Sequence, residues 1–212
     1  LLGSLKSTEP PRKFKIENDE NVSIIKRPIT QAIIIPIFFV GAYFGSVGIT
    51  VVAYVNSMNH SNLTGALLAI WALGSAIAAI INGATKWHRT HAQLFIYSLN
   101  FLLFVSFALL AVKSVYVLAI ILFINGLGIS PVLVNAYAAM EESVSERELT
   151  EAMTWVTTGT PTGGAIGSAV AGRIIDKFNA TSGFWVPISA LLIANLALLP
   201  YLKVWIRLRS RP

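Results

Sequence analysis

Long apolar stretches separated by short polar segments dominate the chain from residue 32 onward. Each stretch reaches the roughly 20 residues that an α-helix needs to cross a bilayer. The pattern therefore predicts an all-α fold, a polytopic transmembrane helix bundle of six spans. We expect these spans at residues 32–56, 63–85, 92–112, 115–139, 152–174 and 184–206.

The residues on either side of this bundle have a different composition. The chain begins with LLGSLKSTEPPRK, an apolar start followed by charge and proline, and residues 6–28 hold few apolar side chains. We expect residues 1–31 to be the end of a preceding helix followed by a charged cytoplasmic linker. We expect 207–212 to be a basic cytoplasmic tail, and a part upstream of the linker to be missing.

The charges are few and their distribution is uneven. Charged residues make up 12% of the chain, which has a net charge of +6. Thirteen of the 16 Lys and Arg residues fall before the first span, in the last turn of the sixth span or after it, or in the second and fourth connections. This bias predicts a plasma (inner) membrane protein with both termini in the cytoplasm. Membrane orientation therefore explains the positive charge, and no nucleic-acid partner is expected.

The inventory of reactive residues argues against an enzyme. There is no cysteine, the three histidines fall in expected connections, and no Gly-x-Ser-x-Gly stands in the chain. A nucleophile with a base, a metal site and a cofactor site all lack their usual residues, so none of these is expected. No ionisable residue lies deep in an expected span. A proton-carrying carboxylate would then belong to the missing part or to another subunit.

Glycine is concentrated in the fifth expected span, in GTPTGGAIGSAVAG at Gly159–Gly172. A phosphate-binding loop would need a Lys-Ser/Thr pair after the last glycine, or a strand before the first, and has neither. Small residues four apart instead let two membrane helices approach closely. The helix-packing candidates are Gly159, Gly163, Gly167, Ser168 and Gly172.

Short sequence matches relate the first three expected spans to the last three. The tripeptide GIT at Gly48–Thr50 recurs as GIS at Gly128–Ser130, and GSAIA at Gly74–Ala78 recurs as GSAVA at Gly167–Ala171. The first and fourth spans start on opposite sides of the membrane. The matches therefore predict an inverted 3+3 repeat, which is common in secondary transporters.

Neutral polar residues mark one face of the first and the fourth expected spans. Interrupted helices in matching positions of two repeats indicate a substrate site near the bilayer midplane, and Pro131 is a candidate hinge in the fourth span. The alternative is that these side chains only join neighbouring helices. Trp71, two turns inside the second span, has the same two interpretations. The cavity-lining candidates are Tyr43, Ser46, Thr50, Trp71, Asn125 and Asn135.

The region RELTEAMTWVTTGTPTGGAIGSAVAGRIIDKF, Arg147–Phe178, resembles the tenth-to-eleventh helix region of bacterial efflux-type members of the major facilitator superfamily. The segment INGATKWHR, Ile81–Arg89, stands where that superfamily has a cytoplasmic loop motif, but lacks the acidic residue of the motif. The resemblance implies the C-terminal six-helix half of such a transporter. The first and fourth spans would line the cavity, the second and fifth would contact the missing N-terminal half, and the third and sixth would face lipid.

The function favoured by these features is secondary active transport of a small solute by alternating access, with proton-coupled efflux implied by the resemblance. Two alternatives stay open. The first is the membrane subunit of an ATP-driven transporter, for which Glu151-Ala152-Met153 matches only part of the ATPase-docking motif. The second is a membrane scaffold that transports nothing. The expected partners are a small-molecule substrate, protons, the lipid bilayer and the N-terminal half.

Overall fold

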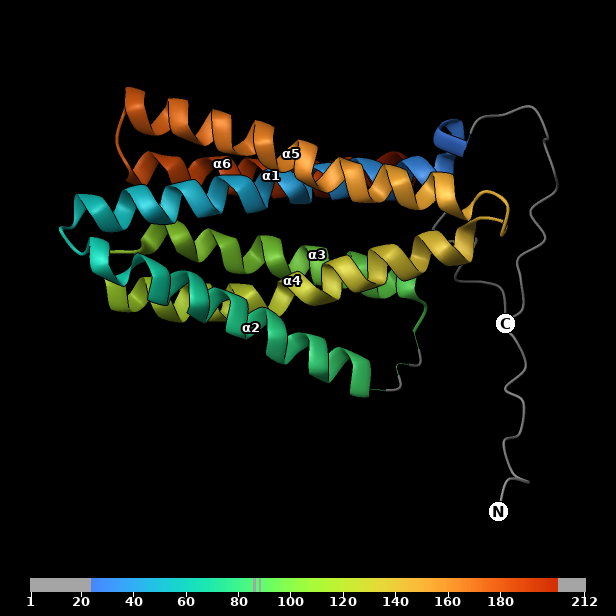
Figure 1. The fold of residues 1–212 in the computed structure, drawn as a ribbon, viewed down its shortest axis with the longest axis horizontal. Helices are drawn as coiled ribbons and strands as arrows, with labels where there is room; N and C mark the ends of the chain where they lie inside the picture. The colour runs from blue at the N-terminus through green and yellow to red at the C-terminus, as the bar shows by residue number, and fades with distance from the viewer. Residues whose placement is uncertain (1–23, 86, 88, 202–212) are drawn as a thin grey trace, which may run out of the picture.

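The computed structural model describes residues 24–85, 87 and 89–201, and these residues form six long α-helices joined by short turns (Figure 1). The expected linker up to residue 23 and the expected tail at 207–212 lie outside the described residues. The first helix begins at Pro28, within the segment expected to be linker. The helices are α1 (Pro28–Ser57), α2 (Thr64–Ala84), α3 (His91–Phe107), α4 (Val115–Ser143), α5 (Leu149–Lys177) and α6 (Trp185–Leu196).

Five helical segments of the described chain are long and apolar enough to cross a membrane, whereas the sequence predicts six. The fifth helix, α5, is absent from this set although its 29 residues exceed the length of a span. Threonines in its first half lower its hydropathy. The hydroxyls of Thr154, Thr158 and Thr162 each donate to the carbonyl four residues earlier, at 2.8, 2.6 and 2.7 Å. Hydroxyls satisfied within their own helix are compatible with a membrane environment.

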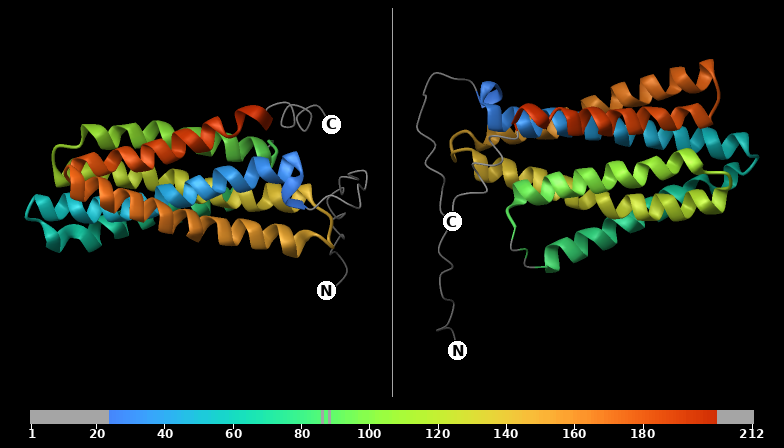
Figure 2. Two further views of the ribbon diagram at one scale, coloured as in Figure 1. Left: turned by 90° about the horizontal axis from the view of Figure 1, so that it is seen from above. Right: turned by 180° about the vertical axis from the view of Figure 1, so that it is seen from behind.

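The six helices form two groups of three. In one group α1 packs against α5 and α6, and in the other α4 packs against α2 and α3 (Figures 1 and 2). Exchanging α1 with α4, α2 with α5, and α3 with α6 converts one group into the other. The helices α1 and α4 also run in opposite directions along the molecule (Figure 1). The packing therefore has the inverted 3+3 arrangement that the sequence matches predict.

Close backbone contact defines the pairing of α1 with α5. A Cβ atom on Gly45 would collide with the Gly164 carbonyl, and one on Gly167 would collide with the Ala42 carbonyl. The two helices approach too closely at this crossing for any side chain larger than hydrogen at Gly45 or Gly167.

The pairing of α4 with α2 repeats this geometry residue by residue. A Cβ atom on Gly126 would collide with the Trp71 carbonyl, and one on Gly74 would collide with the Phe123 carbonyl. Gly126 therefore has the kind of contact in α4 that Gly41 and Gly45 have in α1.

The helix-packing candidates of α5 have different surroundings. Gly163 and Gly167 lie directly against the α1 backbone, and the Ser168 hydroxyl lies beside Gly45. The space next to Gly159 and Gly172 is open within the described residues. The close contact with α1 therefore extends from Thr160, whose carbonyl lies against Gly41, to Ser168.

The candidate hinge Pro131 lies inside α4, which continues through it as a bent helix (Figure 1). Proline lacks the backbone N–H that would bond to the carbonyl one turn earlier, so the ladder is interrupted there. The side-chain amide of Asn135 donates to the Pro131 carbonyl at 2.7 Å. This contact supports the helix on the C-terminal side of the bend.

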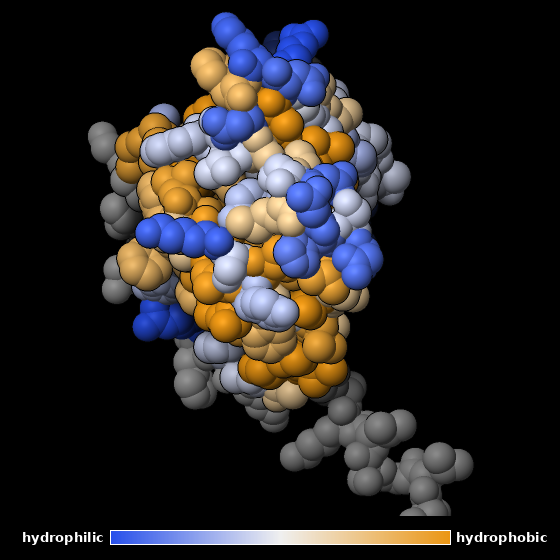
Figure 3. Space-filling model, turned by 90° about the vertical axis from the view of Figure 1, so that its left-hand side faces the viewer, coloured by the Kyte–Doolittle hydropathy of each residue, from blue (hydrophilic) through white to orange (hydrophobic). Residues whose placement is uncertain are grey.

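The two ends of the bundle carry the connections. One end holds the links after α1, α3 and α5, and its surface shows hydrophilic residues scattered among apolar ones (Figure 3). The opposite end holds the start of α1 and the links after α2 and α4. Between the ends, large apolar side chains such as Phe104 and Ile120 are exposed on the flanks, at 80% and 63%. Such flanks suit contact with lipid rather than water.

Candidate functional site

A chain of buried hydrogen bonds crosses the centre of the molecule between the two helix groups. The Tyr43 hydroxyl on α1 donates to the Asn125 side-chain oxygen on α4. The Asn125 amide donates to the Ser106 hydroxyl on α3 at 3.0 Å, and Ser106 donates to the Leu102 carbonyl at 2.7 Å. Tyr43, Asn125 and Ser106 are fully buried. The structure thus brings together two of the sequence-predicted residues and adds a third.

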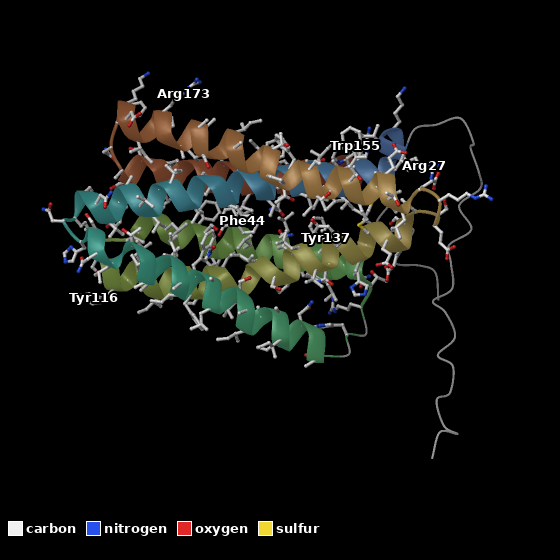
Figure 4. The ribbon with its side chains drawn as sticks, in the orientation of Figure 1. Arg27, Phe44, Tyr116, Tyr137, Trp155 and Arg173 are labelled. Atoms are coloured by element: carbon white, nitrogen blue, oxygen red, sulfur yellow. The ribbon has the colours of Figure 1, made fainter. Side chains whose placement is uncertain are left out.

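Two aromatic rings lie beside this chain of hydrogen bonds. The Trp71 ring of α2 is edge-on to Tyr43, with ring centres 6.4 Å apart, and 6.0 Å from the ring of Phe44. Phe44 and Trp71 are half-buried, and Phe44 lies between α1 and α2 near the middle of the molecule (Figure 4). The indole N–H of Trp71 is buried and makes no hydrogen bond of ordinary geometry with the described residues. The indole N–H therefore lies close to the Tyr43 side chain, next to a partly covered face of the site.

Ser46 and Thr50 continue the polar face of α1 but make no hydrogen bond with Asn125. The Ser46 hydroxyl donates to the Tyr43 carbonyl at 2.9 Å, within the same helix. The Thr50 side chain is buried against Gly183, in the short turn before α6, and its hydroxyl has no hydrogen-bond partner among the described residues. Both side chains serve the packing of α1 in this structure.

Asn135 lies in a separate polar cluster, nearer the start of α3. Its side-chain oxygen is 2.9 Å from Nδ1 of His91. The other ring nitrogen of His91 is 3.8 Å from the Glu142 carboxylate, and both of these side chains are partly exposed. Asn135 follows Asn125 by about 15 Å along a helix of 1.5 Å rise per residue. The two asparagines share a helix and belong to different sites.

An acidic–basic pair with short contacts ties the start of α1 to the connection after α4. The Arg27 guanidinium donates to both Glu148 oxygens at 3.0 and 2.6 Å, and Ser145 donates to the same carboxylate at 2.7 Å. The side chains of Arg27 and Glu148 are 17% and 25% exposed. The hydrogen bonds from Arg27 lower the pKa of the Glu148 carboxyl below its ordinary value, with a smaller contribution from Ser145.

The polar groups at the centre of the molecule are of the kinds that bind small polar molecules. Tyr43, Asn125, Ser106 and Trp71 supply neutral donors and acceptors inside an apolar surround, with no charged group among them. Neutral groups of these kinds orient polar solutes in binding sites, and here Tyr43, Asn125 and Ser106 bond to one another. Among the described residues, no three His, Cys, Asp or Glu side chains gather as a metal centre requires.

Sequence reasoning missed Ser106, Phe44 and His91. Ser106 is a lone serine within the apolar run FLLFVSFALL, so no polar stripe marks it. Phe44 follows a predicted site residue, but one aromatic residue in an apolar span carries no signal of its own. His91 could have been found, because a histidine at the first turn of a membrane helix lies at interface depth, where it can reach a neighbouring helix.

Two comparisons with known proteins found no counterpart, since no curated protein and no solved structure matches the chain. The third comparison found a family. The model of the Major Facilitator Superfamily matches residues 37–212, which include all six helices except the first part of α1. This match covers most of the 212 residues and agrees with the paired three-helix groups. The chain therefore belongs to the Major Facilitator Superfamily, whose members are membrane transporters.

Proposed function

We propose that this chain is the C-terminal half of a secondary transporter that exports a small solute by alternating access, in exchange for protons. The observation that carries the proposal is the hydrogen bond from Tyr43 to Asn125. It joins the first helices of the two inverted repeats at the point where they cross. In secondary transporters, substrate sites lie at such repeat interfaces.

The solute path runs over the partly exposed rings of Phe44 and Trp71, with the Tyr43–Asn125 pair behind them. Support comes from the indole N–H of Trp71, which lies against the Tyr43 side chain without a hydrogen bond of ordinary geometry, because a poorly satisfied buried donor costs free energy unless a ligand or water completes its bonding. Ser46, Thr50 and Asn135 then act on the path indirectly, through the packing of α1 and α4.

A second six-helix half closes the path from the opposite side. Two outward faces built of small or hydroxyl-bearing residues support this part of the proposal, because such faces let helices of two domains approach closely. The residues of the α2 face are Gly65, Ala69, Ala72, Ala76 and Ala79, all exposed. Those of the α5 face are Thr154, Thr158, Thr162, Ala165 and Ala169, also exposed.

Proton coupling requires a group that carries the proton. We place this carboxylate in the N-terminal half, since the centre of the described half holds only neutral polar side chains. The bias of Lys and Arg orients the protein with both termini in the cytoplasm of the plasma membrane. The start of α1 and the Arg27–Glu148 pair then lie at the cytoplasmic surface.

The direct test uses everted membrane vesicles from cells that express the complete reading frame containing this chain. The vesicles are energised, and uptake is measured for ethidium, a disaccharide and an amino acid as three solute classes. We expect uptake of one class to stop when a protonophore collapses the gradient while ATP is kept constant. Uptake that survives the protonophore and requires ATP would favour the ATP-driven alternative. A folded protein that moves no solute of any class would favour the scaffold.

The assignment of Trp71 to the solute path is tested by Trp71→Phe, which keeps an aromatic ring and removes the indole donor. Loss of one hydrogen bond of about 1 kcal/mol raises the half-saturating solute concentration about fivefold. The matched control is Trp185→Phe, since Trp185 is 57% exposed at the start of α6. Equal transport by both variants and the parent protein would remove Trp71 from the site.

A further inference from the structure

A lateral crevice of about 550 Å³ opens between α2, α3 and α4, away from the Tyr43–Asn125 site. Toward its C-terminal end α2 diverges from α3, and the gap between them is visible from behind (Figure 2, right). The walls of the crevice are apolar over most of their length. They are formed by Ala78 and Ile81 of α2, Phe101 of α3, and Leu127 of α4.

One end of the crevice has a different chemistry. Arg89, in the connection between α2 and α3, lines it together with Trp87 and Tyr97. The Arg89 guanidinium lies 4.7 Å from the centre of the Tyr97 ring, which fixes the cation at the mouth. Arg89 is exposed and forms no ion pair with any acidic side chain of the described residues. Among the described residues, the mouth therefore holds a positive charge that no acidic side chain contacts directly.

The second connection joins two helices that are long and apolar enough to cross a membrane, so the mouth of the crevice is expected where this connection meets the bilayer. Trp87, 48% exposed, and Tyr97, 53% exposed, are the aromatic types that lie at headgroup level. An arginine at that depth binds a phosphate through paired hydrogen bonds, while the apolar walls below it match a hydrocarbon chain. A cationic mouth above an apolar crevice complements a molecule with an anionic head and an apolar tail.

We propose that this crevice is a binding site for one anionic phospholipid, with the phosphate on Arg89 and an acyl chain between α2, α3 and α4. The site is independent of the solute path. It does not require transport activity, and its failure leaves the proposed function intact. A segment of the N-terminal half is the competing occupant, and the experiment below excludes or establishes it.

The test measures lipid binding to the purified full chain by native mass spectrometry after delipidation. Dioleoyl phosphatidylglycerol is titrated against dioleoyl phosphatidylcholine, with inorganic phosphate as a competitor. We expect one tightly bound phosphatidylglycerol, weaker phosphatidylcholine, and no displacement by millimolar phosphate. In Arg89→Gln, the affinity for phosphatidylglycerol should fall about fivefold, the effect of about 1 kcal/mol for one basic residue near a charged headgroup.

Two further variants distinguish the contribution of the charged mouth from that of the apolar walls. Arg147→Gln removes an exposed positive charge from the connection after α4 and should leave binding unchanged. Ser98→Phe fills the crevice, which Ser98 lines, without altering charge, and should lower the affinity for both lipids. Equal phosphatidylglycerol binding by Arg89→Gln and the parent chain would overturn the proposal. Full binding by Ser98→Phe would also overturn it, because the lipid would then lie outside the crevice.

The complete transporter provides the final check on the occupant. A photoactivatable phosphatidylglycerol with a diazirine in its acyl chain should label peptides from α2, α3 and α4 in native membranes. Labelling that appears in the isolated chain and disappears in the complete transporter would mean that the N-terminal half fills the crevice, against the proposal.

Discussion

Tyr43 and Asn125 satisfy one another in a place where neither can reach water. Both side chains are fully buried, and Asn125 also donates to Ser106. In an apolar interior, loss of one partner leaves the other with the desolvation cost of an unpaired polar group. The pair therefore determines how α1 and α4 cross.

Tyr43→Phe removes the hydroxyl and keeps the ring. We expect the free energy of unfolding to fall by about 1 kcal/mol, the typical value for an interhelical hydrogen bond in a membrane protein. Unfolding in detergent by increasing denaturant measures it. Tyr116→Phe is the matched control, because Tyr116 is 79% exposed at the start of α4. An equal effect of the two substitutions would mean that the buried hydrogen bond contributes nothing.

At the scale of helices, the α1–α5 and α2–α4 crossings depend on glycines, because there is no space for a larger side chain at these positions. Gly167→Ala would place a methyl group on the Ala42 carbonyl, whereas Gly159→Ala, on the same helix, enters open space. We expect the first to destabilise the protein by about 1–3 kcal/mol. The second should be neutral or stabilise by up to about 1 kcal/mol, through the better helix propensity of alanine. Thermal unfolding of both variants measures this difference in stability, and similar melting temperatures would contradict close packing at Gly167.

The pair of Arg27 and Glu148 links helices through charge, so its contribution depends on pH. The pKa of Glu148 is lowered in the folded protein, so the stabilisation is complete above the ordinary glutamate pKa of about 4.3. It is lost as the pH falls through the lowered value. We expect the stability difference between the parent chain and Glu148→Gln to be constant from pH 7 to about pH 5, and to vanish at lower pH.

Chemical unfolding across this pH range measures the difference, with Glu151→Gln as the control. Glu151 is an exposed carboxylate in the first turn of α5, three residues after Glu148. A difference that persists unchanged to pH 3 would show that Glu148 acts through something other than its charge.

The sequence was sufficient to predict the helices, and insufficient to predict which residues of neighbouring helices meet at each depth. Apolar runs located all six helices, and polar spacing selected Tyr43 and Asn125, which meet. The same spacing grouped Asn135 with Asn125, because a helical face is defined by angle and carries no information on which neighbour lies at each turn. Ser106 could not be found, since its role depends on α3 lying beside α4.

At the scale of the whole molecule, the inverted repeat explains why the site lies at the centre. The two three-helix groups meet through α1 and α4, and their outer helices α3 and α6 lie on one side of the molecule (Figure 2). Close backbone contact at glycines such as Gly45 and Gly126 constrains the size of those residues and leaves their sequence neighbours free, so the two repeats share few residues. A second half placed against α2 and α5 would enclose the rings of Phe44 and Trp71.

The most direct measurement compares water access to the two faces of the bundle in native membranes. The chain has no cysteine, so single cysteines at Phe44 and at Phe104, which is 80% exposed on α3, report without background. Maleimides react with the thiolate, which forms in water and not in lipid. We predict rapid labelling of Phe44→Cys by a water-soluble maleimide and no labelling of Phe104→Cys. Labelling of Phe104→Cys with Phe44→Cys protected would contradict a solute path over Phe44 and Trp71.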